Sequence, residues 1–220
     1  DGQKQRILLA RAICQEPELI VLDEPTSYLD IKYKLELLSI LRKMAKEKNI
    51  TVVMSLHEID LAQKISDKII CVKGETISWY GEPEQVFKDD IIRDLYGLDN
   101  GYFDTVFGSV ELPGAVGKPE VFVLSSCGNG IPVYRRLQKE QIPFATGILY
   151  TNDVDYQVAK YLAAEVVTEQ PFCSISDQSL ERALRLMSQC NKIINAGVCI
   201  GECNVKMQIL LDEAKKRKSL

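Results

Sequence analysis

The chain has 220 residues, of which 46% are hydrophobic and 26% are charged, a composition typical of folded globular proteins that excludes wholesale disorder. At about 150 residues per domain, this length predicts one large domain or two modest ones. The 27 basic and 31 acidic residues give a formal net charge of −4, which argues against a broad basic face, so we expect no nucleic-acid partner. No apolar run approaches the ~20 residues of a membrane-spanning helix. The seven scattered cysteines, an odd number, favour a reduced, cytoplasmic setting over a disulfide framework.

The first hundred residues alternate between helical and extended patterns. The order predicted along the chain is a helix that begins at Asp1 or Gly2, a strand at 19–22, a helix at 31–48, a strand at 50–55, a helix at 59–65, and strands at 68–72 and 76–80 joined by a hairpin turn. This order predicts a mostly parallel α/β layer. The short apolar run at 19–22 is typical of a strand that is buried on both faces.

Polar residues follow two of these strands directly. Asp23 and Glu24 come after the first strand, and His57, the only histidine, comes after the next. An isolated acidic pair is most often an exposed loop, and a lone histidine is most often structural. The carboxyl ends of parallel strands, however, meet at one edge of a sheet, where α/β proteins bind their ligands. The combination therefore favours a site. The helix start at Asp1-Gly2-Gln3 offers free amides that suit phosphate.

Together these segments resemble the nucleotide-binding subunit of an ABC transporter. Asp1-Gly2-Gln3 resembles the tail of the signature motif, Leu19 to Glu24 resembles Walker B with its catalytic glutamate, Ser27 to Asp30 resembles the D-loop, and His57 resembles the switch histidine. The resemblance covers residues 1–97. Within the family, the segments 55–62 and 81–86 are most similar to importers of iron-siderophores, haem or cobalamin. The implied fold is a partial P-loop NTPase sheet that lacks its N-terminal half.

The resemblance also implies a role for each residue. Asp23 would hold Mg²⁺ through a water molecule, Glu24 would polarise the attacking water, and His57 would donate a hydrogen bond to the γ-phosphate of ATP. Asp1, Gly2 and Gln3 would bind the nucleotide of a partner subunit, and Asp30 would lie at the dimer seam. The implied partners are a second ATPase subunit in a homodimer, transmembrane permease subunits and, indirectly, a solute-binding protein. The intact subunit would sit peripherally on the inner face of the cell membrane.

The phosphate-binding loop of such ATPases, Gly-x-x-x-x-Gly-Lys-[Ser/Thr], does not occur in these 220 residues. The segment Gly114 to Pro119 imitates its end, but its spacing is wrong and Pro119 stands where the metal-binding hydroxyl belongs. We therefore expect the chain to be a fragment of a longer subunit. The resemblance implies that ATP and Mg²⁺ would serve the intact subunit, and the fragment alone is expected to bind neither tightly and to be inactive.

Glycine and proline punctuate residues 98–118, which predicts a linker with short strands at 102–107 and 109–112. Beyond it, residues 119–220 predict a small Rossmann-like, doubly wound parallel-sheet domain. Its strands are expected at 120–125, 143–149, 165–168 and 192–196, and its helices at 131–141, 153–164, 176–190 and 204–216.

The loops that follow these four strands are expected to converge on one edge. They predict a ligand crevice lined by Ser126, Gly128, Asn129, Gly130, Asn152, Asp153 and Asn195. The Gly-rich turn within that set is either a plain tight turn, which we favour, or an anion site on backbone amides. Cys127, Cys173, Cys199 and Cys203 lie in the same loops. Free thiols explain them better than a metal or cluster, because their spacing does not match a zinc knuckle and no histidine accompanies them.

The leading hypothesis is therefore the C-terminal portion of the ATP-hydrolysing subunit of an ABC importer for an iron-siderophore, haem or cobalamin-like solute. One alternative is a regulatory module whose second domain binds a small ligand. Another is an ABC-type ATPase of DNA repair or chromosome organisation, which is disfavoured because the sequence has no long heptad arms.

Overall fold

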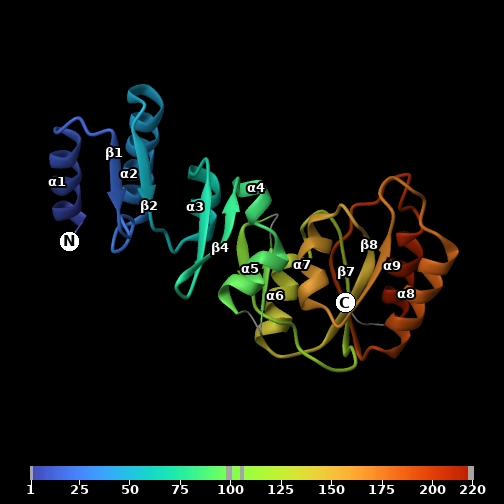
Figure 1. The fold of residues 1–220 in the computed structure, drawn as a ribbon. Helices are drawn as coiled ribbons and strands as arrows, with labels where there is room; N and C mark the ends of the chain where they lie inside the picture. The colour runs from blue at the N-terminus through green and yellow to red at the C-terminus, as the bar shows by residue number, and fades with distance from the viewer. Residues whose placement is uncertain (1, 98–100, 105–106, 218–220) are drawn as a thin grey trace. The chain divides into compact units, whose positions relative to one another are not determined.

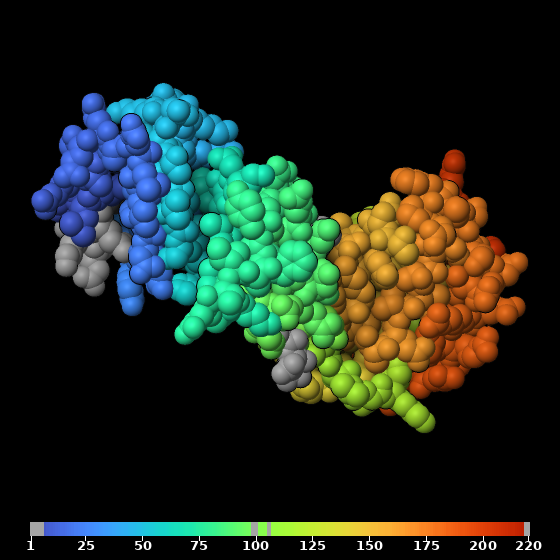
Figure 2. All heavy atoms as spheres, viewed as in Figure 1, coloured from blue at the N-terminus to red at the C-terminus, as the bar shows by residue number. Residues whose placement is uncertain are grey.

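The computed structural model describes residues 2–97, 101–104 and 107–217, and divides the chain into two compact units, residues 1–97 and 98–220 (Figure 1). In the space-filling view the first unit runs from blue to green and the second from green to red (Figure 2). Among the described residues, none of the helices combines the length and apolar character that crossing a membrane requires.

The first unit begins with two parallel strands and the helices that pack on them. Its elements here are α1 (Gly2–Ile13), β1 (Leu19–Leu22), α2 (Ile31–Lys48) and β2 (Thr51–Met54). The pairing of β1 with β2 is parallel and sets Leu22 beside Met54. Leu37, Leu41 and Met44 of α2 are buried in the apolar clusters beneath these strands. The predicted parallel α/β arrangement is thus confirmed.

The prediction that the first strand is buried on both faces is wrong. Ile20 is buried in a cluster with Met44 and Ile50, whereas Leu19 and Val21 on the opposite face are 54% and 68% exposed. Adjacent residues of a strand point to opposite faces, and within the described residues helices cover only one of them. An apolar β-sheet face therefore remains open in this unit.

The rest of the first unit is a hairpin with short helices. It consists of α3 (Ile59–Ile65), β3 (Ile69–Lys73), β4 (Thr76–Gly81), α4 (Pro83–Val86) and α5 (Asp89–Tyr96). The antiparallel pair β3–β4 forms a two-stranded sheet of its own among the described residues. Helix α4 begins with a capping box in which the side chains of Glu82 and Gln85 each accept a backbone amide at the helix start.

The second unit is a four-stranded parallel sheet with helices on both faces. Its elements are β7 (Val121–Ser125), α6 (Ile131–Lys139), β8 (Phe144–Tyr150), α7 (Val154–Leu162), β9 (Glu165–Glu169), α8 (Asp177–Gln189), β10 (Lys192–Gly197) and α9 (Met207–Lys216). The strand order is β10-β7-β8-β9. One apolar cluster joins the sheet to α6 and α7, and another joins it to α8 and α9. The predicted doubly wound sheet is thus found, with shorter helices.

The segment predicted as a linker contains a hairpin, β5 (Tyr102–Asp104) and β6 (Ser109–Glu111), and belongs to the second unit. Two side chains of α6 attach it. Arg135 forms an ion pair with the buried carboxylate of Glu111, and Gln138 donates a hydrogen bond to the carbonyl oxygen of Leu112. Polar contacts with α6 therefore hold residues 109–112, which the glycine and proline content alone had predicted to be part of a linker.

Candidate functional site

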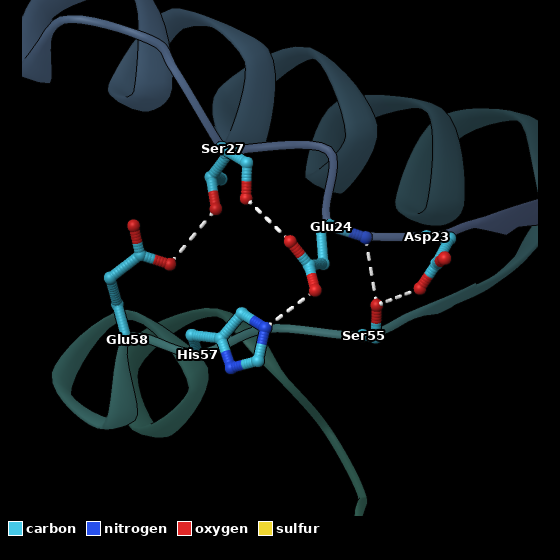
Figure 3. A network of polar contacts seen from close by, with 7 residues as sticks. Asp23, Glu24, Ser27, Ser55, His57 and Glu58 are labelled. Carbon is cyan, nitrogen blue, oxygen red and sulfur yellow. Dashed lines mark hydrogen bonds and ion pairs between the residues drawn. The ribbon is translucent and has the colours of Figure 1, made fainter.

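The acidic turn after β1 is joined to the end of β2 by a serine. The hydroxyl of Ser55 donates to Oδ1 of Asp23 at 2.6 Å and accepts the backbone amide of Glu24 at 2.7 Å (Figure 3). Because β1 and β2 end at the same level, with Leu22 beside Met54, the residues that follow the two strands come together. The strand register thus brings the predicted acidic residues to one edge.

The carboxylate of Glu24 lies between two side chains that hold it in place. Its Oε1 atom is 2.6 Å from Nε2 of His57, and its Oε2 atom accepts a hydrogen bond from the hydroxyl of Ser27 at 2.9 Å (Figure 3). The side chains of His57 and Glu24 are 74% and 45% exposed, so both remain open to a ligand from solvent. Asp23, Glu24 and His57 therefore share one network at an accessible rim.

The histidine and the glutamate change each other's proton affinity. The hydrogen bond from His57, followed by that from Ser27, lowers the pKa of Glu24 below 4.5. The hydrogen bond to Glu24 and the negative charge of that carboxylate raise the pKa of His57 above 6.5. Each group of the pair thus favours the charged form of the other.

The carboxylate of Glu58, next to His57, links the same two loops through a second set of contacts. Glu58 accepts a hydrogen bond from the hydroxyl of the buried Thr26 at 2.9 Å and forms an ion pair with Lys34 of α2. The hydrogen bond from Lys34, with a further one from Thr26, lowers the pKa of Glu58. Glu58 therefore ties the turn that carries Glu24 to the segment that carries His57.

Four residues of this network received no role from the sequence: Ser55, Thr26, Lys34 and Glu58. Ser55 could have been found, because it directly follows β2 and the rule that selected Asp23 applies to it equally. The pairing of Lys34 with Glu58 joins residues 24 positions apart and has no local signal in the sequence.

The other predicted nucleotide-binding residues lie apart from this network or outside the description. Asp1 lies outside the described residues. Gly2 and Gln3 are placed only as backbone in the first turn of α1, and Asp30 is an exposed residue that precedes α2. Their predicted contacts with a partner's nucleotide stay predictions.

The carboxylate of Asp23 suits a magnesium ion whose other ligands are mostly water molecules. No group of three metal-ligating side chains occurs among the described residues, so Asp23 would contribute a carboxylate oxygen rather than form a full cage. Mg²⁺ is commonly held by one or two carboxylates, water and the phosphates of its substrate. The exposed Asp23 fits that mode.

In the second unit, carboxylates occupy the amides of the Gly-rich turn. The amide of Cys127 donates to Asp153 at 3.1 Å, and the amide of Gly130 donates to both oxygens of the fully buried Asp155 at 3.0 and 3.2 Å. Burial raises the pKa of Asp155. Groups that a phosphate would need are thus already satisfied by acidic side chains, which favours the tight-turn interpretation over an anion site.

The remaining predicted crevice residues lie in the loops around that turn. Ser126 accepts the amide of Cys199 at 2.7 Å, and the side chain of Asn195 accepts the amide of Gly197 at 3.1 Å. Asn129 is exposed and donates to the carbonyl oxygen of Gly197 at 3.5 Å, and Asn152 is exposed in the loop after β8. Gly128 lies in the turn itself. A ligand role for these residues stays a prediction.

Comparison with known proteins gives two family matches. The family described as ABC transporter matches residues 1–27, and the MJ0874 family matches residues 144–220. The uncharacterized ABC transporter ATP-binding protein MJ0873 of Methanocaldococcus jannaschii is 43% identical over 150 residues, which is 68% of this chain and 52% of the relative. That match is longer than the first unit and so extends into the second.

Two further relatives carry names of import proteins. The cobalamin import ATP-binding protein BtuD of Halobacterium salinarum is 29% identical over 191 residues, 84% of this chain and 48% of the relative. The petrobactin import ATP-binding protein FpuD of Bacillus anthracis is 35% identical over 98 residues, 44% of this chain and 36% of the relative. The chain spans about half the length of MJ0873 and BtuD. With the geometry at β1 and β2, these matches show that the chain contains the C-terminal part of the ATP-binding domain of the ABC transporter family.

Proposed function

We propose that the first unit supplies the water-activating and magnesium-holding half of an ATPase site in the ATP-binding subunit of an ABC importer. The observation that supports it most is the network in which Asp23, Glu24, Ser55 and His57 meet at one exposed edge. The phosphate-binding loop, which these 220 residues do not contain, would come from the rest of the subunit.

In this proposal the chain's own residues move water and protons at defined atoms. Asp23 would hold the waters of Mg²⁺, which neutralises charge on the ATP phosphates when it is bound. Glu24 would orient the attacking water through a carboxylate that stays ionised because its pKa is lowered. His57 occupies Oε1 of Glu24 in this structure, so it would have to turn toward the γ-phosphate before that oxygen could accept a water. Nucleotide binding would then free the base.

The proposed solute class is an iron-siderophore, haem or cobalamin-like compound. Two relatives named for cobalamin and petrobactin import support it, as do the importer-like segments 55–62 and 81–86. A second copy of the subunit, permease subunits and, indirectly, a solute-binding protein would be the partners, with the ATPase on the cytoplasmic face of the membrane. The 220-residue chain by itself is proposed to neither bind ATP tightly nor hydrolyse it.

The decisive experiment replaces the proposed base in the complete subunit that contains these residues. Glu24→Gln should lower the rate of ATP hydrolysis by about 100-fold or more while ATP binding is retained, because the amide cannot accept the proton of the attacking water. Glu84→Gln, an exposed position in α4, is the matched control and should leave hydrolysis unchanged.

Two results would contradict the proposal. Hydrolysis that persists at the wild-type rate in the Glu24→Gln variant would exclude this carboxylate as the base. Micromolar ATP binding by the 220-residue chain, measured by calorimetry, would show that the phosphates are held without the missing loop.

A further inference from the structure

Two exposed cysteines lie where the strand order of the second unit reverses. Strands β7 and β10 are neighbours, while α6 after β7 and α9 after β10 pack on opposite faces of the sheet. At such a reversal the loops that follow the two strands lead to opposite faces of the sheet. α/β proteins place functional sites at the strand ends between these loops. In this unit those loops are the turn 126–130 and the segment 198–206, which carry Cys127 and Cys199.

Hydrogen bonds already hold the two loops together. The amide of Ser126 donates to the carbonyl oxygen of Gly197 at 3.1 Å, and the hydroxyl of Ser126 accepts the amide of Cys199 at 2.7 Å. The backbone next to each cysteine is thus fixed to the opposite loop. The amide of Cys199 is itself bound to the side chain of the residue before Cys127, which places the two cysteines in adjacent loops.

Cys127 and Cys199 are neighbours in these loops and both are exposed. The Cys199 thiol contributes to the raised pKa of Cys127, and each cysteine is open to a small reagent in solution. Cys127 also has a left-handed backbone with φ of 57°, a conformation that costs energy in a residue with a Cβ atom. The turn therefore holds Cys127 in an uncommon conformation beside its neighbour.

We propose that Cys127 and Cys199 form a reversible disulfide that fastens segment 198–206 to the turn after β7. The bond needs no rearrangement of the sheet, since hydrogen bonds already join the two loops that carry the thiols. This inference concerns the second unit alone and does not depend on the ATPase proposal.

The chemistry balances with a small-molecule disulfide as the oxidant, for example oxidised glutathione. Both thiols are exposed, so the oxidant can reach Cys199 first. Its thiolate attacks one sulfur of the oxidant, forms a mixed disulfide and releases one glutathione thiolate. The thiolate of Cys127 then attacks the sulfur of Cys199 and releases the second. Two electrons pass to the oxidant, and the protons of the two cysteines end on the two released thiols.

A metal site is a weaker explanation of the same thiols. Among the described residues, no third metal-ligating side chain completes a group with this pair. Of the other cysteines in these loops, Cys203 lies 3.7 Å from the carbonyl oxygen of Phe172 and belongs with the loop after β9. A two-partner bond fits the geometry, whereas a tetrahedral ion would need two more ligands.

The test uses the full chain under defined mixtures of reduced and oxidised glutathione. Free thiols are alkylated, and intact mass and peptide mapping then count and locate the unmodified cysteines. The expected result is that oxidised protein loses two of its seven alkylation sites and yields a peptide that links Cys127 to Cys199. Excess reduced glutathione should restore all seven. Cys14→Ser, which removes an exposed cysteine of the first unit, should behave as wild type.

Variants give the second arm of the test. Cys127→Ser and Cys199→Ser should each abolish the linked peptide, and because both positions are exposed, serine should leave the fold intact. The proposal fails if oxidation gives only stable glutathione adducts, a Cys173–Cys203 link, or bonds between two chains. It also fails if the purified protein holds about one zinc ion per chain that protects both thiols from alkylation until a chelator is added.

Discussion

At the scale of single residues, the contact between Glu24 and His57 explains how two exposed side chains can shift each other's pKa. Exposed ion pairs are usually weak, because water screens the charges and long side chains lose freedom. Here a third side chain, Ser27, binds the second carboxylate oxygen, so both oxygens of Glu24 are held in place. Hydrogen bonding, more than burial, therefore shifts the pKa values of this pair.

Replacing the glutamate should change the titration of the histidine. Because Glu24 raises the pKa of His57 above 6.5, Glu24→Gln should lower the histidine pKa toward that value. His57 is the only histidine, so one imidazole resonance in NMR spectra reports it without assignment. The charged pair stabilises the fold fully between about pH 4.5 and 6.5. This contribution is lost as the pH rises through the raised pKa of His57 or falls through the lowered pKa of Glu24 in the folded state.

The same titration contains its own control. Glu47→Gln, on the exposed surface of α2, should leave the histidine pKa at the wild-type value. Glu58→Gln should lower it less than Glu24→Gln does, since Glu58 acts on His57 through its charge alone. Equal shifts in the Glu24 and Glu58 variants would mean that the hydrogen bond to Glu24 is absent in solution.

Ser55 should matter for stability although it is exposed. Ser55→Ala removes the hydroxyl that links Asp23 to the amide of Glu24, and we expect a loss of about 1 kcal/mol in the free energy of unfolding. The fluorescence of Trp79, the only tryptophan, reports urea unfolding of the first unit. Ser39→Ala, on the exposed face of α2, should cost nothing, and equal losses in the two variants would contradict the bridging role.

At the scale of elements, the sheet of the second unit contains a buried polar chain that runs from strand to helix. The hydroxyl of Tyr134 on α6 lies 2.6 Å from Oγ of Ser125 and 2.9 Å from Oγ1 of Thr146, which donates to the carbonyl oxygen of Val123. Burial raises the pKa of Tyr134, so its phenolic hydroxyl keeps its proton. The chain therefore joins β7, β8 and α6 through hydroxyl groups inside an apolar core.

Removing the central hydroxyl should destabilise the second unit. Tyr134→Phe leaves the buried Ser125 and Thr146 with fewer partners, and an unsatisfied buried hydroxyl costs about 1–3 kcal/mol. Urea unfolding followed by circular dichroism measures the change. Tyr156→Phe is the control, because its partly buried ring packs against the same apolar cluster. A Tyr134→Phe protein as stable as wild type would show that water replaces the lost hydroxyl.

The elements themselves could be predicted from sequence more fully than their surroundings. The apolar runs gave β1, β7 and the other parallel strands to within about a residue at each end, because buried strands in parallel sheets are continuously hydrophobic. The open face of β1 could not be predicted this way. Leu19 and Val21 are apolar whether or not a second layer of structure covers them, so their hydrophobicity does not show that they are exposed. Hydrophobicity shows what can be buried, not what is available to cover it.

The residues of the candidate site likewise fall into those that the sequence could predict and those that it could not. Asp23, Glu24 and His57 could be predicted because each follows a strand, and strand ends in one sheet must meet. Lys34, Thr26 and Glu58 could not, because their contacts depend on how α2 and α3 pack rather than on strand ends. The occupied amides of the Gly-rich turn were equally hidden, since Asp155 reaches Gly130 from 25 residues away.

At the scale of the whole molecule, each apolar core cluster lies inside one of the two units. The clusters of the second unit cover both faces of its sheet, whereas those of the first lie beneath a sheet whose other face is exposed. Buried apolar area is the main source of folding free energy, so the two units differ in how much of it they have. The polar site at β1 and β2 therefore sits on the less protected unit.

The chain should consequently unfold in two steps, with the first unit unfolding at the lower urea concentration. Trp79 is about half exposed, and its emission should shift to longer wavelength in the early step, before most of the circular dichroism signal is lost. The second step should keep its midpoint in a protein reduced to residues 98–220, because its core is contained in that range. Coincident transitions by both probes would instead mean that the two units unfold cooperatively, and that the open apolar face of β1 is protected in solution by contacts that the isolated sheet does not have.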